Sequence, residues 1–283
     1  MVIISQIELN KIYNEECLEG MAERIPDKSI DMILCDLPYG TTACSWDSII
    51  PLKPLWEQYK RIIKDDGLLC LFADEPFSSH LILSNIGWFK YRITWDKKQG
   101  SGFLNSHKRP LTQTEDICIF SKSLLGNHTY NPQIKDKALN KIRPVGNRKV
   151  SGKTTYNKNN GKYSNEYNKT KSHPTNLISV SSRREECNSL NRVHPTQKPV
   201  SLFEYLIKTY TDKREIVLDN TIGSGTTGVA CLRTDRNFIG FEWCPNEPHD
   251  KYYNIALKRI GKFDKKYYEQ LPEKEKPAKL QLF

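Results

Sequence analysis

The apolar residues of this chain fall into short runs that alternate with segments of helical spacing. A run such as 68–72 has the length of a buried strand, whereas Leu55, Tyr59 and Ile62 recur at the spacing of a helix face. Before residue 122 we expect strand 30–35, helix 52–63, strand 68–72, helix 76–85 and strands 89–95 and 116–120. This alternation is typical of a parallel α/β sheet.

The alternation returns in the last third of the chain. There we expect helix 202–210, strand 215–219, helix 226–232, strand 237–242 and an amphipathic helix 249–260. Two separate domains would each contain only a few strands. We therefore favour one sheet to which both halves of the chain contribute.

A block without periodicity separates these halves. Residues 125–192 are dominated by Asn, Lys, Ser, Thr, Tyr and Gly. The chain has a net charge of +10, and residues 122–198 alone carry 16 Lys and Arg against 4 Asp and Glu, which leaves the remainder at −2. Such a cationic insert favours a nucleic-acid partner. The alternative is a disordered Asn- and Lys-rich loop, above all at 151–172.

A glycine loop, residues 219–227, joins a predicted strand to a predicted helix. Gly223 and Gly225 allow a tight turn and a close approach to a ligand, and the helix start offers N–H groups. Glu242 ends the next strand, 23 residues after Asp219, where a carboxylate can accept hydrogen bonds from ribose hydroxyls. The loop lacks a third glycine at dinucleotide spacing and a P-loop lysine. We favour a small nucleoside ligand such as S-adenosylmethionine over an ordinary turn.

A second turn, Asp36-Leu37-Pro38-Tyr39, follows the predicted strand 30–35. Strand carboxyl ends line the ligand crevice of an open α/β sheet. Methylation of an exocyclic base amine needs two acceptors for its N–H bonds, because the nitrogen lone pair is delocalised into the ring. Asp36 and the Leu37 carbonyl, stiffened by Pro38, offer them, and Tyr39 offers a surface for an extruded base. Taken alone, this turn would be read as structural.

Together these motifs resemble the β group of amino-methylating DNA methyltransferases, which modify adenine N6 or cytosine N4. Residues 36–39 are similar to the family's catalytic D-P-P-Y, and residues 219–227 to its cofactor motif D-P-F-x-G-S-G-T. Residues 194–199 read H-P-T-Q-K-P, like the segment that precedes the cofactor strand. Leu37 replaces the first proline of the catalytic motif, and residues 220–222 replace the usual Pro-Phe-x.

The resemblance implies a seven-stranded, mostly parallel, Rossmann-like sheet with one antiparallel strand at its edge and an inserted DNA-recognition region. The implied division is a catalytic half at 1–121, a target-recognition insert at 122–193, a cofactor-binding half of the same sheet at 194–265 and a flexible tail at 266–283. The implied partner is duplex DNA, with the target base flipped out. The loops 41–47 and 100–109 could also close on DNA, or they could be solvated surface loops.

The resemblance also implies the roles of individual residues. The implied catalytic residues are Asp36, Leu37, Pro38 and Tyr39. The implied contacts of S-adenosylmethionine are Asp36, Asp219, Gly223, Ser224, Gly225 and Thr226 around its methionine part, Glu242 at the ribose, Glu16 and Cys17 at the adenine, and Thr196 and Lys198 beside the carboxylate.

The expected activity is methylation of adenine N6 in DNA, since N4-cytosine enzymes of this family often begin their catalytic motif with Ser. An N4-cytosine activity, a non-catalytic DNA-binding relative and an RNA or protein substrate stay open. A homodimer and a separate cognate restriction endonuclease also stay open.

Other protein classes fit the sequence poorly. The longest apolar runs are far shorter than the ~18 residues of a membrane span, and the first residues lack the features of a signal peptide. The eight cysteines form no C-x-x-C pair, which argues against a zinc module. We expect no metal, no membrane partner and a reducing, cytoplasmic setting.

Overall fold

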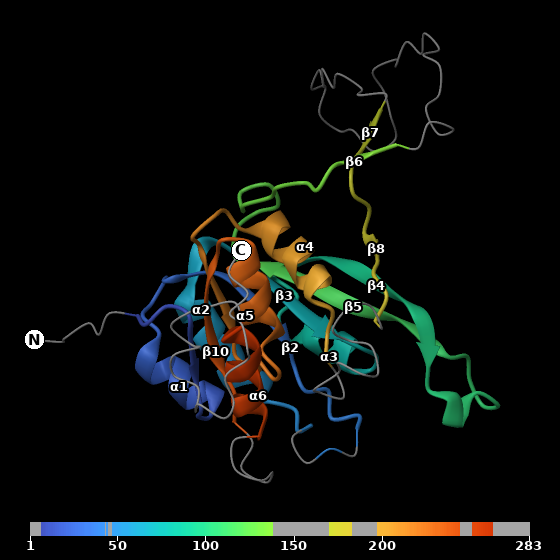
Figure 1. Cartoon of the computed structure of the whole chain (residues 1–283), viewed down its shortest axis with the longest axis horizontal. Helices are drawn as coiled ribbons and strands as arrows, with labels where there is room; N and C mark the ends of the chain where they lie inside the picture. Colours follow the sequence, from blue (N-terminus) through green and yellow to red (C-terminus); the bar gives the residue numbers. More distant parts are fainter. Residues whose placement is uncertain are drawn as a thin grey trace, which may run out of the picture. The chain divides into compact units, whose positions relative to one another are not determined.

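The computed structural model describes residues 7–42, 44, 47–137, 170–182, 197–243 and 251–262. The chain forms two compact units, residues 1–131 with 176–283 and residues 132–175. In the smaller unit, the described strands β6 (Lys135–Asp136) and β7 (Lys171–Ser172) pair antiparallel. The larger unit holds the main sheet (Figure 1).

The main sheet has eight described strands in the order β1-β10-β9-β2-β3-β5-β4-β8. Their bounds are β1 Lys11–Tyr13, β2 Ile30–Asp36, β3 Ile63–Ala73, β4 Phe89–Ser101, β5 Thr112–Ser121, β8 Leu177–Ser179, β9 Ile216–Asp219 and β10 Asn237–Phe241. The strands from β1 to β3 in this order are parallel to one another. Strands from both halves of the chain pair directly in β2 and β9, so the chain has the single sheet that we favoured.

The expectation of an antiparallel strand at the edge of the sheet is wrong, because the antiparallel strand lies inside the sheet. β5 is antiparallel to both of its neighbours, β3 and β4, while β8 pairs parallel with β4 at the edge. The cause is the connection of β4 and β5, because a chain that returns directly through a hairpin must pair antiparallel. The eighth strand, β8, comes from the segment that we assigned to the insert.

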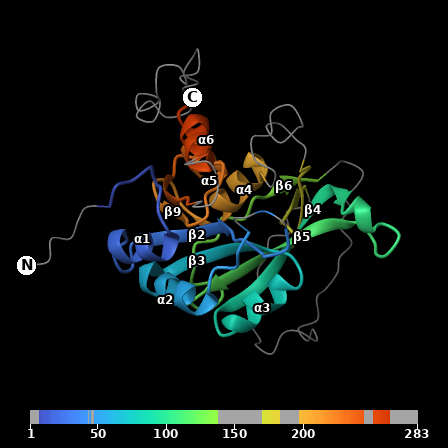
Figure 2. The same cartoon turned by 90° about the horizontal axis from the view of Figure 1, so that it is seen from below.

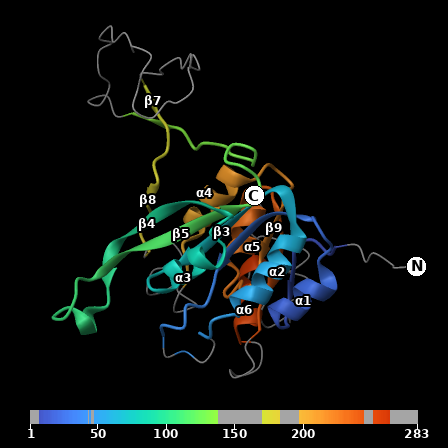
Figure 3. The same ribbon diagram turned by 180° about the vertical axis from the view of Figure 1, so that it is seen from behind.

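Helices cover both faces of the sheet (Figure 2). Their bounds are α1 Cys17–Arg24, α2 Leu52–Ile62, α3 Phe77–Ser84, α4 Val200–Tyr210, α5 Thr226–Arg233 and α6 Lys251–Ile260. Along β2, Met32 and Leu34 join the core beneath α4, α5 and α6, whereas Ile33 and Cys35 join the core beneath α1, α2 and α3. Successive strand residues point to opposite faces, so an uninterrupted apolar run is what a strand covered on both sides requires. Figure 3 shows the second face from behind.

The predicted strands and helices are present, but three strands are longer than predicted. β3 begins at Ile63, five residues before the predicted start, β4 ends at Ser101, six residues after the predicted end, and β5 begins at Thr112, four residues before the predicted start. β1 and α1 were not predicted. Residues 138–169 and 183–196 of the cationic block, and the tail 266–283, lie outside the described residues. The boundaries proposed at 121 and 193 stay predictions. No helix in the described part of the chain has the length and apolar character needed to cross a bilayer.

Candidate active site

The carboxyl ends of β2, β9 and β10 open onto one cavity of about 460 Å³, a volume within the ~300–1,000 Å³ usual for small-molecule sites. The predicted site residues that line it are Glu16, Cys17, Asp36, Leu37, Pro38, Tyr39, Lys198, Asp219, Gly223, Ser224, Thr226 and Glu242. Thr196 lies outside the described residues. The fold therefore brings the catalytic and cofactor motifs, far apart in sequence, to the same cavity.

The glycine loop has the backbone that its sequence predicts. Gly223 and Gly225 have φ angles of +54° and +83°, a region that glycine adopts without strain. A Cβ atom at Gly225 would lie 3.1 Å from the Cα of Ala256, so this glycine also allows α6 to approach the loop. The role of Gly225 in the structure is thus close packing beneath the loop.

Two carboxylates flank this loop, of which Asp219 is buried and Glu242 is partly buried. Asp219 accepts hydrogen bonds from the Thr227 hydroxyl and, at 3.1 Å, from the Thr221 N–H. Glu242 Oε2 accepts the Gly223 N–H at 2.8 Å. Burial raises the pKa of Asp219 to about 7 and the pKa of Glu242 to about 7, and the hydrogen bonds oppose the rise. Both groups therefore change charge near neutral pH.

Arg259 of α6 holds the glycine loop from below, and sequence reasoning missed it. Its Nη1 donates to the Ser224 carbonyl at 2.7 Å, the Ser224 hydroxyl at 2.8 Å and the Thr226 hydroxyl at 3.2 Å. Arg259 is buried, and a guanidinium is suited to several acceptors at once. A cation in the last turn of an amphipathic helix is usually a surface residue, so nothing in the local sequence distinguishes Arg259.

Asn220, which stands where the family has proline, forms a buried polar cluster. Its Oδ1 accepts from the Tyr59 hydroxyl at 2.6 Å and from the Cys35 thiol at 2.9 Å, and its Nδ2 donates to Cys17 Sγ at 3.5 Å. Burial raises the pKa of Cys17 to about 12, which keeps this thiol neutral beside the cavity. Glu16 caps α1 by accepting from the Leu18 and Glu19 N–H groups.

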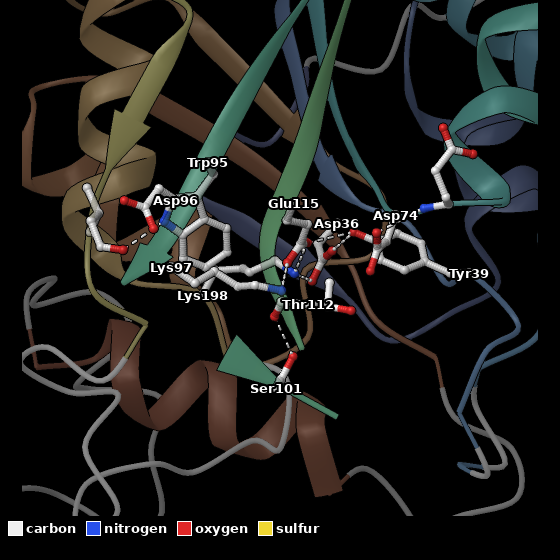
Figure 4. Close-up of polar contacts among 12 residues, drawn as sticks. Asp36, Tyr39, Asp74, Trp95, Asp96, Lys97, Ser101, Thr112, Glu115 and Lys198 are labelled. Carbon is white, nitrogen blue, oxygen red and sulfur yellow. Dashed lines mark hydrogen bonds and ion pairs between the residues drawn. The ribbon is translucent and has the colours of Figure 1, made fainter. Parts of the chain in front are cut away.

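Asp36 ends β2, and two donors hold its carboxylate (Figure 4). The Tyr39 hydroxyl donates to Oδ1 at 2.8 Å, and Lys198 Nζ lies 3.0 Å from Oδ2. Burial raises the pKa of Asp36; Lys198 opposes that rise and Glu115 adds to it. The Tyr39 ring stacks on Phe77 with 5.4 Å between ring centroids, which fixes the plane of the aromatic side chain.

Glu115, which sequence reasoning also missed, completes this cluster from β5. Its Oε1 accepts from Lys198 Nζ at 2.6 Å and from the Tyr39 hydroxyl at 2.9 Å, and its Oε2 lies 3.7 Å from Lys97 Nζ. Burial opposes the charge of Lys198, yet the carboxylates of Asp36 and Glu115 raise its pKa above the usual value. The only sequence signal was a carboxylate directly before the predicted strand 116–120.

Two links tie the catalytic turn to its surroundings. The Thr221 hydroxyl of the glycine loop donates to the Asp36 backbone carbonyl at 3.1 Å. The side chain of Leu37 is buried in the core on the α1–α3 face, so the residue that replaces the family's first proline anchors the turn by packing. Trp243 and Tyr252 line the cavity as well and were not predicted.

A cavity of this size at the strand ends of such a sheet, with carboxylates on its wall, is typical of a Rossmann-like fold that binds a nucleoside ligand. The chain belongs to the DNA methylase family of N6 and N4 amino-methylating enzymes, whose model matches residues 30–258. The family resemblance seen in the sequence is thereby confirmed.

Two curated relatives are Type II methyltransferases. M1.MboII of Moraxella bovis is 29% identical over 275 residues, which cover 90% of this chain and 98% of the relative. M.HpaI of Haemophilus parainfluenzae is 28% identical over 251 residues, which cover 84% of this chain and 70% of the relative. The similarity supports DNA methylation within restriction-modification systems as the setting of this family.

Two solved structures share the fold. M1.HpyAVI in complex with S-adenosylmethionine has a TM-score of 0.56 at 23% identity, covering 88% of this chain and 98% of that one. The cytosine-N4-specific PvuII DNA methyltransferase has a TM-score of 0.57 at 16% identity, covering 88% and 92%. The predicted fold class is confirmed. The predicted cofactor, S-adenosylmethionine, is the ligand in the first of these two structures.

We expect Arg259→Leu to loosen the glycine loop. The substitution leaves the buried Ser224 carbonyl without its donor, and a hydrogen bond to a charged group contributes about 1.5–3 kcal/mol. The free energy of unfolding in a denaturant titration should fall by about 2–3 kcal/mol, and amide exchange at residues 223–227 should accelerate.

The same substitution at Arg233 provides a matched control. Arg233 forms a partly exposed ion pair with Glu204, so its loss should change stability by less than about 1 kcal/mol. Unchanged amide exchange in the glycine loop of the Arg259→Leu variant would show that this arginine does not support the loop.

Proposed function

We propose that this protein transfers the methyl group of S-adenosylmethionine to the exocyclic N6 of adenine in duplex DNA. The observation that carries the proposal is the convergence of the Asp36–Tyr39 turn and the glycine loop on one cavity, with the Thr221 hydroxyl joining the two at the Asp36 carbonyl. A methyl donor and an amine acceptor can then meet at the same strand ends.

The residues of the cavity fit the cofactor. Among the described residues, the Gly223 N–H is the group that bonds to the Glu242 carboxylate, through Oε2, so Oε1 can accept from a ribose hydroxyl. Gly223 and Ser224 offer loop backbone for the methionine part, and Glu16 and Cys17 lie on the same cavity wall for the adenine. When bound, S-adenosylmethionine supplies an activated methyl group. Thr196 and Lys198 beside its carboxylate stay predictions.

The catalytic turn positions the target amine. The Asp36 carboxylate accepts one N–H of the amine, and the Leu37 carbonyl, set by Pro38, accepts the other. These bonds draw the nitrogen lone pair out of conjugation with the ring, so the nitrogen can attack. Tyr39, stacked on Phe77, presents its ring to the flipped base.

The second candidate is the same reaction at cytosine N4. The acidic first residue of the catalytic motif favours adenine, whereas the structural likeness to the cytosine-N4-specific PvuII enzyme favours the alternative. A non-catalytic DNA-binding relative is the third candidate. A separate cognate endonuclease, a homodimer and a cytoplasmic location remain predictions.

The loop between β4 and β5 supports a DNA partner. All residues from 101 to 110 are exposed, including the apolar pair Phe103 and Leu104 at 68% and 91%. Residues 102–111 contain Lys108 and Arg109 and neither Asp nor Glu. Cations neutralise phosphates, and exposed apolar side chains fit between base steps, so we propose that this loop contacts the duplex together with the cationic insert.

The central test is transfer of labelled methyl from S-adenosylmethionine to duplex DNA. Asp36→Ala should lower the rate by about 10²–10⁴-fold, because the variant loses the acceptor that holds the amine. Asp27→Ala, which removes an exposed partner of Arg61, should leave the rate unchanged. Equal rates in all three proteins, or no transfer by the unaltered protein, would refute the proposal.

Mass spectrometry of the digested product nucleosides then separates the candidates. N6-methyladenine supports the lead proposal, and N4-methylcytosine supports the second. Binding of DNA without any modified base supports the non-catalytic relative.

We expect binding of S-adenosylmethionine to weaken as pH falls through 7. Burial raises the pKa of Glu242 to about 7, and protonation removes the charge that accepts the ribose hydroxyls. One such group implies an affinity about tenfold lower at pH 6 than at pH 8, measurable by calorimetry.

The Glu242→Gln variant should bind S-adenosylmethionine more weakly at pH 8. The ratio of its affinities at pH 8 and pH 6 should be about tenfold smaller than in the unaltered protein. Asp219, whose pKa burial also raises to about 7, titrates in both proteins, so the difference between the two curves isolates Glu242. Glu57→Gln, at an exposed position on α2, should behave like the unaltered protein. Parallel curves for the Glu242→Gln variant and the unaltered protein would contradict the assignment.

If the β4–β5 loop contacts DNA, substitutions of its cations should change the salt dependence of DNA binding. Lys108→Ala and Arg109→Ala should each weaken DNA binding and reduce the slope of log K against log salt by about 0.9, the value for one lost phosphate contact. Fluorescence anisotropy across a salt series measures the slope. Lys213→Ala, which removes an exposed partner of Asp235, should keep the original slope. Identical slopes would place DNA away from this loop.

A further inference from the structure

Glu115 is a buried carboxylate next to the catalytic turn, and the proposed reaction does not by itself require it. Its relative exposure is 8%, and it is not among the described residues that line the cavity. A buried charge costs free energy unless partners compensate it, so the position of Glu115 next to Asp36 and Tyr39 needs a physical explanation.

The two donors that hold Asp36 are the same two that hold Glu115 (Figure 4). Tyr39 Oη lies 2.8 Å from Asp36 Oδ1 and 2.9 Å from Glu115 Oε1. Lys198 Nζ lies 3.0 Å from Asp36 Oδ2 and 2.6 Å from Glu115 Oε1. Asp36 and Glu115 thus share both donors, and the shorter contact of the ammonium is with Glu115.

This sharing matters because Asp36 must become available when a target amine enters. A phenol has one proton and can give it to only one carboxylate at a time. An amine N–H that approaches Asp36 competes with the Tyr39 hydroxyl and the Lys198 ammonium. Without a second acceptor, each displaced donor would be left buried and unpaired, at a cost that would oppose substrate binding.

We propose that Glu115 is a positioning residue that retains Tyr39 and Lys198 while Asp36 binds the target amine. The proposal rests on the proposed function. Glu115 Oε1 already lies within hydrogen-bond distance of both donors, so the Tyr39 proton and the Lys198 ammonium can turn to Glu115 when the amine takes their place at Asp36. Lys97, 3.7 Å from Glu115 Oε2, balances the charge of Glu115 from β4. Glu115 acts through Tyr39, Lys198 and Asp36, and touches none of the reacting atoms.

The test is Glu115→Gln, which keeps the size of the side chain and removes its charge. The glutamine oxygen can still accept a hydrogen bond, but Asp36 is then the carboxylate that pairs with the Lys198 ammonium and holds it more tightly. The maximal turnover should therefore fall by about 10- to 100-fold, as expected when one charge-assisted hydrogen bond becomes a neutral one. The dissociation constants of S-adenosylmethionine and DNA should stay within about twofold, because Glu115 does not line the cavity.

The pH dependence of turnover is a second measurement, and it should not change if Glu115 has only a structural role. Lys198 and Tyr39 contact Asp36, Glu115 binds the same two donors, and Lys97 and Asp219 are further charged groups nearby. Removing the negative charge of Glu115 stabilises ionised Asp36, so the acid limb of turnover should shift to lower pH in the Glu115→Gln variant. Glu115→Asp keeps the charge and should keep the acid limb in place, with an intermediate turnover.

Glu204→Gln on α4 is the matched control and should leave turnover unchanged. The proposal is overturned by full turnover in the Glu115→Gln variant, by an unshifted acid limb, or by a loss explained entirely by weaker cofactor or DNA binding. If Glu115→Gln does not fold, a Glu115→Asp variant that matches the unaltered protein in turnover overturns it equally. Failure of the proposed function looks different, because the unaltered protein would then transfer no methyl group.

Discussion

The pairing of β2 with β9 is the constraint on which the site depends. Met32 lies opposite Val217 and Ile33 opposite Leu218 in a parallel register, although about two thirds of the chain separates them. Because parallel strands end at the same edge of the sheet, this register brings Asp36 and Asp219 to one cavity. A slip of one residue would turn the alternating side chains of β2 to the wrong faces and remove the Asp36 carboxylate from the site.

The second constraint is the burial of charge at this edge. Glu115 and Lys198 are buried and Asp36 is partly buried, and the contacts among the three offset the cost of removing their charges from water. Burial also raises the pKa of Asp219 and of Glu242 to about 7. A site with such carboxylates is unfavourable for stability and suited to ligands that donate hydrogen bonds, which a ribose and a base amine both do.

Sequence reasoning reached the parts of this site that local patterns encode. Apolar runs identified the buried strands. The turn residues after 35 and 219 identified the cavity wall, because proline and glycine determine the backbone conformation at their own positions. Glu115 and Arg259 could not be found in this way, since each derives its role from contacts with residues distant in the sequence. The inner position of β5 is likewise a tertiary choice that no single segment specifies.

The departures from the family motifs show how side-chain hydrogen bonds can replace proline stiffness. A proline at position 220 has no N–H, whereas the Asn220 N–H donates to Cys35 Sγ at 3.4 Å and its side chain accepts from Tyr59. Thr221 adds the bond to the Asp36 carbonyl. The bonds to Cys35 and to the Asp36 carbonyl join the glycine loop to the end of β2. The cofactor motif and the catalytic turn are therefore held to each other directly, and a displacement of one must be transmitted to the other.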